Sequence, residues 1–130
     1  MRKGLIAATL LLLAGTAFAQ ERSVRILVGF APGAGTDLLA RLVADRMRVT
    51  LGQPVIVENK PGVSGIVATE AAKASPPNGT TLILQPLAPM VAHPYTYAKL
   101  NYDPVRDFDP VAHLAEFQLA FAVGPQLGVH

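Results

Sequence analysis

The sequence predicts an α/β fold in which a parallel sheet is flanked by helices. Between Val24 and Gln85, short runs of β-branched and apolar residues alternate with segments whose apolar residues recur at helical spacing. The connections between these segments are short and rich in glycine and proline. A strand–helix–strand–helix–strand order with short connections is typical of a parallel sheet with right-handed crossovers.

The first 19 residues have the pattern of a secretory signal peptide. Arg2 and Lys3 form a positive start, Leu5–Ala14 an apolar run, and Ala17-Phe18-Ala19 a small-x-small cleavage site. A comfortable membrane span needs about 20 apolar residues, and this run is shorter. We therefore expect export and cleavage after Ala19.

Charge and cysteine content exclude several classes of function. The chain has 11 basic and 9 acidic side chains, and Arg2 and Lys3 are among the basic ones. Removal of the signal peptide leaves nine of each sign, so the mature chain has no basic excess that would indicate a nucleic-acid partner. Cysteine is absent, which excludes disulfides, thiolate nucleophiles and cysteine-ligated metals.

The first strand, loop and helix are predicted around a glycine-rich turn. An apolar run over Ile26–Phe30 predicts a strand, Ala31–Gly35 a loop, and the following segment a helix that stops at Gly52. Thr36 or Asp37 is expected to be the N-cap. The apolar face of the predicted helix consists of Leu38, Leu39, Leu42, Val43 and Met47.

This turn is a candidate anion cradle. A helix N-terminus presents unpaired N–H groups and a partial positive charge, and Gly33 and Gly35 let a ligand approach the backbone. Thr36 and Asp37 stand where a Walker loop needs Lys and Ser or Thr, and Leu38 where a dinucleotide loop needs glycine. A small carboxylate or a neutral polar ligand fits better. A plain strand–helix turn remains the alternative, as does a purely first-turn role for Asp37.

Two further strands and one helix complete the predicted sheet. The strands are predicted over Gln53–Asn59 and Thr80–Gln85, and Val63–Ala74 between them reads as a helix with Ser64 as its N-cap. In a parallel sheet the carboxyl ends of the strands meet at one edge, where ligands bind. The loops expected to converge there are 31–36, 60–65 and 86–90.

Beyond the third strand the pattern becomes irregular. Met90–Tyr97 predicts a short helix, and the Asp-Pro pairs around residues 103–110 predict turns rather than a calcium loop. Val111–Ala115 and Phe117–Val123 read as strands. The second of these is strongly apolar, and no predicted element follows it to complete the sheet. We therefore expect it to drive self-association, and we interpret the chain as a fragment.

No catalytic or metal-binding constellation is visible. His93, His113 and His130 lie in separate segments without ligand spacing, and His93 is expected to be a loop or surface histidine. Ser64 and Ser75 have no partnering histidine in a readable arrangement. We expect no catalytic residues, no metal and no cofactor. An exported hydrolase, the alternative class, would need a nucleophile and a base.

Three segments together resemble the Bug family, the periplasmic solute-binding proteins of tripartite tricarboxylate transporters. They are FAPGAGTDLLARLVADRM (30–47), LGQPVIVENKPGVSG (51–65) and APMVAHPYTYAKLNYDPVRDFDPV (88–111). The similarity runs from about Val24 to Pro125. It implies a type II periplasmic-binding-protein fold, whose two α/β lobes clamp a small carboxylate or related solute.

The resemblance also implies an organisation for this chain. Residues 1–19 are expected to be the signal peptide, 20–116 part of the first lobe, and 117–130 the start of a crossover toward a second lobe. The implied function is a periplasmic, non-enzymatic receptor fragment that delivers its solute to the membrane subunits of the transporter. A truncated, non-functional gene product is the alternative.

The ligand-facing positions implied by the resemblance lie in the three converging loops. Ala34, Ile66 and Ala68 depart from the family pattern, which has glycine, a polar residue and glycine there, and these changes leave room for an altered ligand. The implied ligand-binding residues are Pro32, Gly33, Ala34, Gly35, Thr36, Asp37, Gly62, Ser64, Gly65, Pro86, Ala88 and Met90.

Overall fold

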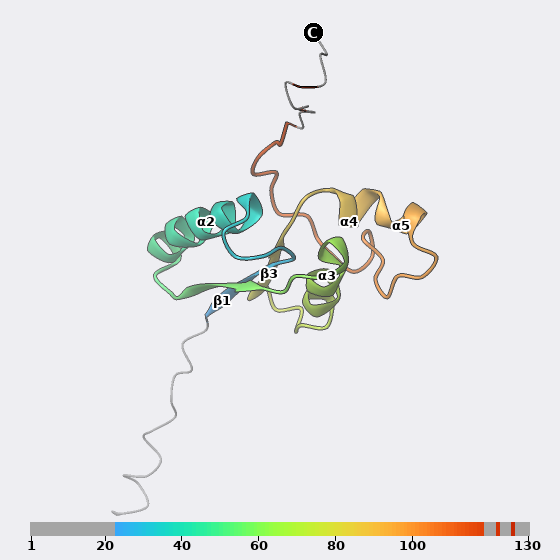
Figure 1. Ribbon diagram of the computed structural model, residues 1–130. Coiled ribbons are helices and arrows are strands. Elements are labelled where there is room, and N and C mark those ends of the chain that lie inside the picture. The colour runs from blue at the N-terminus through green and yellow to red at the C-terminus, as the bar shows by residue number, and fades with distance from the viewer. Residues whose placement is uncertain (1–22, 119–121, 123–125, 127–130) are drawn as a thin grey trace, which may run out of the picture.

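The computed structural model describes residues 23–118, 122 and 126 (Figure 1). The predicted signal peptide and most of Phe117–Val123 therefore lie outside the described residues. The elements, in chain order, are β1 (Val24–Val28), α2 (Gly35–Leu51), β2 (Val55–Asn59), η1 (Val63–Gly65), α3 (Ile66–Lys73), β3 (Thr81–Leu84), α4 (Ala88–Val91) and α5 (His93–Thr96).

The three strands form a parallel sheet in the order β2-β1-β3. Val28 at the end of β1 is level with Asn59 of β2 and with Leu84 of β3. All three strands therefore end at the same edge, and the loops that follow them start side by side. The predicted parallel sheet with flanking helices is confirmed.

Helix α2 packs on one face of the sheet and buries a different stripe from the predicted one. Val43 and Met47 pack against the core as expected, but Leu38 and Leu42 are each 60% exposed. The small alanines allow the helix backbone to approach the strands closely, so they replace the leucines at the interface. The fully buried members of this cluster are Ile26, Val28, Ala40 and Ala44.

Helix α3 covers the opposite face. Side chains alternate along a strand, so Leu27 and Gly29 face away from the α2 side. A Cβ atom placed on Gly29 would lie 2.6 Å from the Cα of Gly65 and 3.4 Å from the Cβ of Ala68. Gly29 is therefore the point where the start of α3 lies almost directly against the end of β1.

The N-caps differ from the predicted ones. Ala34, in extended conformation, is the N-cap of α2, so Thr36 and Asp37 occupy the second and third positions of the helix. The N-cap of α3 is Gly65, and Ser64 instead has a left-handed backbone with φ 54°. Neither N-cap makes a side-chain hydrogen bond to its helix, because alanine and glycine have no side-chain acceptor. The predicted stop at Gly52 is confirmed.

The segment after β3 contains little regular structure. The single helix predicted over Met90–Tyr97 is two four-residue helices, α4 and α5, each with a proline in its first turn. The strand predicted over Val111–Ala115 is absent, and these residues are exposed and irregular. Asp103 forms the expected turn, since its carboxylate accepts the backbone N–H groups of Val105 and Arg106. Within residues 23–118, no helix combines the length and apolarity needed to cross a membrane.

Candidate functional site

The three loops at the carboxyl edge of the sheet meet at Gly65. A Cβ on this buried glycine would lie 3.4 Å from Oε1 of Gln85, 3.4 Å from Cγ of Pro89 and 3.7 Å from the ring of Phe30. Phe30 belongs to the first loop, Gly65 to the second, and Gln85 and Pro89 to the third. The predicted convergence of the three loops is therefore present in the structure, and it surrounds a glycine with φ 94°.

Asp37 organises the first loop from inside. Its side chain is 2% exposed, and its Oδ2 accepts hydrogen bonds from the Gly33 N–H at 2.8 Å and from Nε of Arg41 at 2.9 Å. Its Oδ1 accepts Nδ2 of Asn59 at 2.9 Å. Asn59 also donates to the Phe30 carbonyl at 3.1 Å, and Arg41 donates to Oδ1 of Asn59 at 3.2 Å. The carboxylate thus ties the loop, α2 and the end of β2 together.

The same contacts keep Asp37 ionised. The hydrogen bond from Arg41 lowers the pKa of Asp37 most, followed by those from Gly33 and Asn59, and together they hold it far below its usual value of 3.8. In return, the bond to Asp37 raises the pKa of Arg41. Both carboxylate oxygens of Asp37 are engaged by these donors, so we assign this carboxylate to positioning of the loop and not to ligand contact.

The backbone N–H groups available to a ligand start at Gly35. The N–H of Gly33 donates to Asp37, and that of Ala34 donates to the Ala31 carbonyl at 3.2 Å. Among residues 23–118, the N–H groups of Gly35, Thr36 and Asp37 have no protein acceptor. These are the first three positions of a 17-residue helix, where the helix dipole adds partial positive charge.

The remaining predicted site residues fall into two groups. Pro32, Gly33, Ser64 and Ala88 are exposed, whereas Pro86 and Met90 are partly covered. Gly62 has φ 148° and packs so closely that a Cβ there would lie 2.8 Å from Cγ2 of Val67. Of the departures from the family pattern, Ile66 is 8% exposed and Ala68 is fully buried. The side chains of Ile66 and Ala68 therefore contribute to the packing of α3.

A polar pair lies beneath Gly65. The hydroxyl of buried Thr69 is 2.9 Å from the Gly65 carbonyl and 3.0 Å from Oε1 of Gln85, while Nε2 of Gln85 is buried without a partner among the described residues. A threonine hydroxyl has one hydrogen to donate, and here it donates to the Gly65 carbonyl oxygen. The Thr69 oxygen and Oε1 of Gln85 therefore face each other with no hydrogen between them. If the Gln85 amide is turned by 180°, its nitrogen donates to the Thr69 oxygen and both groups have a partner.

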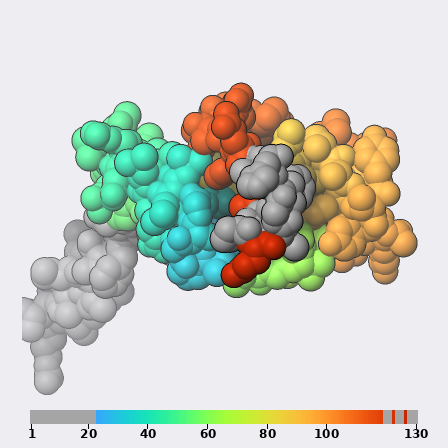
Figure 2. Space-filling view, turned by 45° about the horizontal axis from the view of Figure 1, so that its top comes forward, coloured from blue at the N-terminus to red at the C-terminus, as the bar shows by residue number. Residues whose placement is uncertain are grey.

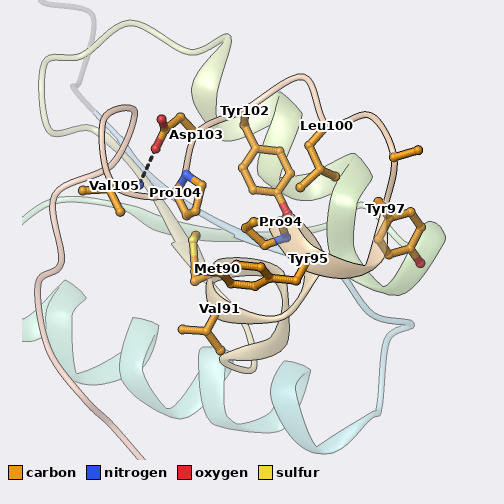
Figure 3. A pocket seen from close by; sticks show the side chains of 11 residues that line it. Met90, Val91, Pro94, Tyr95, Tyr97, Leu100, Tyr102, Asp103, Pro104 and Val105 are labelled. Carbon is orange, nitrogen blue, oxygen red and sulfur yellow. Dashed lines mark hydrogen bonds between the residues drawn. The ribbon is translucent and has the colours of Figure 1, made fainter.

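Met90 lies away from the meeting point of the loops. It lines an open groove of about 600 Å³ between α4, α5 and the segment 97–105 (Figure 3). The buried Tyr102 forms one wall and donates its hydroxyl to the Pro89 carbonyl at 2.7 Å. Burial raises the pKa of the Tyr102 phenol. His93, predicted to be at the surface, is 6% exposed instead, and its ring packs edge-on against Tyr97.

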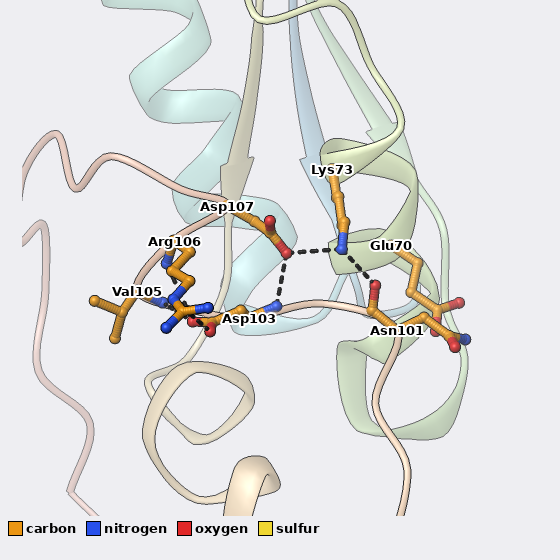
Figure 4. A network of polar contacts seen from close by, with 7 residues as sticks. All are labelled: Glu70, Lys73, Asn101, Asp103, Val105, Arg106 and Asp107. Atoms are coloured by element: carbon orange, nitrogen blue, oxygen red, sulfur yellow. Dashed lines mark hydrogen bonds and ion pairs between the residues drawn. The ribbon is translucent and has the colours of Figure 1, made fainter.

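Polar contacts fasten the 101–107 segment to α3 (Figure 4). Nζ of Lys73 is 2.8 Å from both the Asn101 carbonyl and Oδ2 of Asp107, and Glu70 accepts the Asn101 amide at 2.8 Å. The backbone N–H of Asp103 donates to Asp107, and this bond, followed by that from Lys73, lowers the pKa of Asp107. The segment holds Tyr102, which fixes Pro89 beside Gly65.

Within the described part of the chain, no group of three His, Asp or Glu side chains could hold a metal ion. The geometry provides backbone donors, glycine surfaces and packed loops, which suit the binding of a small anion at the end of a sheet.

Comparison with known proteins agrees with this geometry. Residues 39–129 match the family described as "Tripartite tricarboxylate transporter family receptor". The chain belongs to this receptor family. Protein BugT of Bordetella pertussis is 33% identical over 107 residues, which are 82% of this chain and 33% of BugT.

Two solved structures share the fold of this chain. MatC from Rhodopseudomonas palustris, solved with bound malate, is 41% identical, with a TM-score of 0.67 over 71% of this chain and 31% of MatC. The periplasmic binding protein BugD is 35% identical, with a TM-score of 0.56 over 68% of this chain and 29% of BugD. The chain therefore spans about a third of the length of these relatives.

Several residues of this candidate site carry little signal in the sequence. Asn59 and Gln85 are polar residues at the ends of apolar strands, and that position was the available clue. Pro89 and Phe30 contact Gly65 only because the loops fold together, so no local pattern marks them.

Proposed function

We propose that this chain is part of a periplasmic solute-binding receptor that takes a small carboxylate and delivers it to the membrane subunits of a tripartite tricarboxylate transporter. The observation that carries the proposal is the set of unpaired N–H groups at Gly35, Thr36 and Asp37, placed where three loops of a family receptor converge. Backbone donors at a helix N-terminus bind carboxylates without needing a cation.

Membership in the family supports the location and the absence of catalysis. BugD is named a periplasmic binding protein, and residues 1–19 of this chain have the pattern of an export signal. The bound malate of MatC supports a carboxylate as the kind of ligand. We infer that the ligand carboxylate accepts hydrogen bonds from the first turn of α2, while Gly65 and its neighbours border the ligand.

Replacement of Gly35 tests this site directly. Proline is well tolerated at the first helical position, and the extended Ala34 before it has the backbone that a proline requires. Gly35→Pro therefore removes one donor with little effect on α2. Gly35→Ala is the matched control, because it keeps the N–H and its Cβ makes only ordinary contact, 3.7 Å from Phe117.

Acetate, malate and benzoate serve as probes, with binding to the whole chain followed by the amide NMR signals of residues 35–37, or of residues 36 and 37 alone in Gly35→Pro, which has no N–H at position 35. We expect carboxylates to shift these signals, and Gly35→Pro to weaken binding about tenfold, the effect of one hydrogen bond to a charged group. Gly35→Ala should bind nearly as the natural chain does. If none of the three acids shifts these amides, the proposal is wrong.

A further inference from the structure

We propose that Phe117 is a specificity-determining residue of this site, and that the preferred ligand is a monocarboxylate with an apolar or aromatic body. The inference rests on the proposed function. It comes from the contact between Phe117 and the first residue of α2, together with the pairing of the basic side chains around the loops.

Phe117 lies against the residue that begins the row of unpaired donors. Its ring atom Cε1 is 3.7 Å from the position of a Cβ on Gly35, which is van der Waals distance. Gly35 has no side chain, so the ring approaches the helix terminus itself. The segment 111–118 that holds Phe117 passes between α2 and the α4–α5 pair (Figure 2). The ring is 59% exposed, so a surface remains for a ligand to cover.

A second phenylalanine borders the site from the sheet side. The partly buried Phe30 lies in the first loop, two residues after β1, and has its ring 3.7 Å from a Cβ position on Gly65. Phe117 therefore lies against the residue that starts the unpaired N–H groups of α2, and Phe30 lies at the glycine where the three loops meet. A ligand that places its carboxylate on those groups would gain further affinity from an apolar body resting on the rings.

The charges near the loops favour a single carboxylate. Arg41 is engaged by Asp37 and Asn59, and Nζ of Lys60 lies 3.9 Å from Glu58. Lys73, on the last turn of α3, is engaged by Asp107. The cations on the described elements next to the loops thus have acidic partners already.

Affinity for three acids separates this inference from the wider proposal. The whole chain is titrated with acetate, benzoate and malate, and the amide signals of residues 35–37 report binding. We expect benzoate to bind about fivefold or more tighter than acetate, the gain from covering a small area of apolar ring. Malate, with two carboxylates, should bind no tighter than benzoate.

Variants at Phe117 then test its assigned role. Phe117→Ala should lower the affinity for benzoate toward that for acetate, and should lower the affinity for acetate by a smaller factor. Phe117→Leu should retain part of the preference, since leucine keeps an apolar surface. Leu114→Ala is the matched control, because Leu114 is a similarly exposed apolar residue of the same segment, and it should change neither affinity.

The outcomes distinguish the two ideas. Tightest binding of malate, or an unchanged preference for benzoate in Phe117→Ala, would overturn the inference and leave the carboxylate site intact. Loss of acetate and benzoate binding by equal factors in Phe117→Ala would also overturn it, because a general structural role has that effect. If none of the three acids binds, the proposed function itself is wrong.

Discussion

At the scale of single residues, Asp37 shows how a charge can serve the site without touching a ligand. Its carboxylate accepts bonds from Gly33, Arg41 and Asn59, and these consume the donor that Gly33 would otherwise offer. The N–H groups left for an anion therefore begin two residues later, at Gly35, the first residue of α2. A buried acidic residue and an anion site coexist because Arg41 neutralises the former.

Asp37→Asn should make the protein less stable at neutral pH and less sensitive to acid. Its pKa is lowered in the folded state, so its stabilising effect is complete above the unfolded value near 3.8 and is lost as pH falls toward the folded value. We expect the melting temperature at pH 7 to fall by about 5 °C in the variant. Thermal unfolding followed from pH 7 to pH 2.5 checks both effects.

The control for this experiment is Asp107, a second carboxylate whose pKa is lowered. Asp107→Asn removes an acid whose pKa is also lowered, but whose bonds go to Asp103 and Lys73, away from the loops. It should reduce acid sensitivity without altering the amide signals of Gly35. Equal melting curves for Asp37→Asn and the natural chain at pH 7 would contradict the structural role of the Asp37 contacts.

At the scale of elements, the contact between Gly29 and Gly65 sets the distance between β1 and the start of α3. An alanine at Gly29 would place its Cβ 2.6 Å from the Cα of Gly65 and 3.3 Å from its carbonyl oxygen. Backbone atoms cannot turn aside as a flexible side chain can, so the helix itself would have to move. The position of Gly65 among the three loops depends on this fit.

Gly29→Ala is expected to destabilise the fold by about 1–3 kcal/mol, the cost of overpacking a tight contact. It should also weaken carboxylate binding, because Gly65 moves with α3. Gly79→Ala is the control: its φ of 76° brings backbone strain, but open space surrounds it. Urea unfolding and the acetate titration measure both variants. An unaltered stability of Gly29→Ala would show that α3 shifts freely.

The elements also show which features a sequence can predict. The strand order, the stop at Gly52 and the convergence of the loops follow from local periodicity and from the geometry of parallel sheets. The buried stripe of α2 does not, because small alanines and bulky leucines compete, and the close approach of the sheet decides between them. The caps at Ala34 and Gly65 likewise depend on loop contacts.

Long-range contacts were beyond prediction for the same reason. Asn59 reaches Asp37 only because β2 ends beside the first loop, and Phe117 reaches Gly35 across most of the described chain. The strand pattern of Val111–Ala115 was misleading, since β-branched and apolar residues indicate a strand only where a neighbouring strand offers pairing.

At the scale of the whole molecule, much apolar surface remains uncovered on the described chain. Large apolar side chains are exposed along one stretch after the last helix, and the full chain has a net charge of only +2. Low net charge and exposed apolar residues together favour association. The two outer strands of the described sheet, β2 and β3, each pair on one side only.

We therefore expect the chain to self-associate as its concentration rises, through the segment that holds Val111 and Leu114, which are 82% and 48% exposed. Val111→Lys with Leu114→Lys should weaken association about tenfold, because it replaces two large apolar contacts on this surface. Ala112→Lys with Ala115→Lys adds the same charge on the same segment while removing only small side chains, so it should change association less. Sedimentation velocity over a range of concentrations measures all three proteins. A natural chain that sediments as one monomer throughout, or equal effects of the two double variants, would show that this exposed segment does not drive contact between molecules.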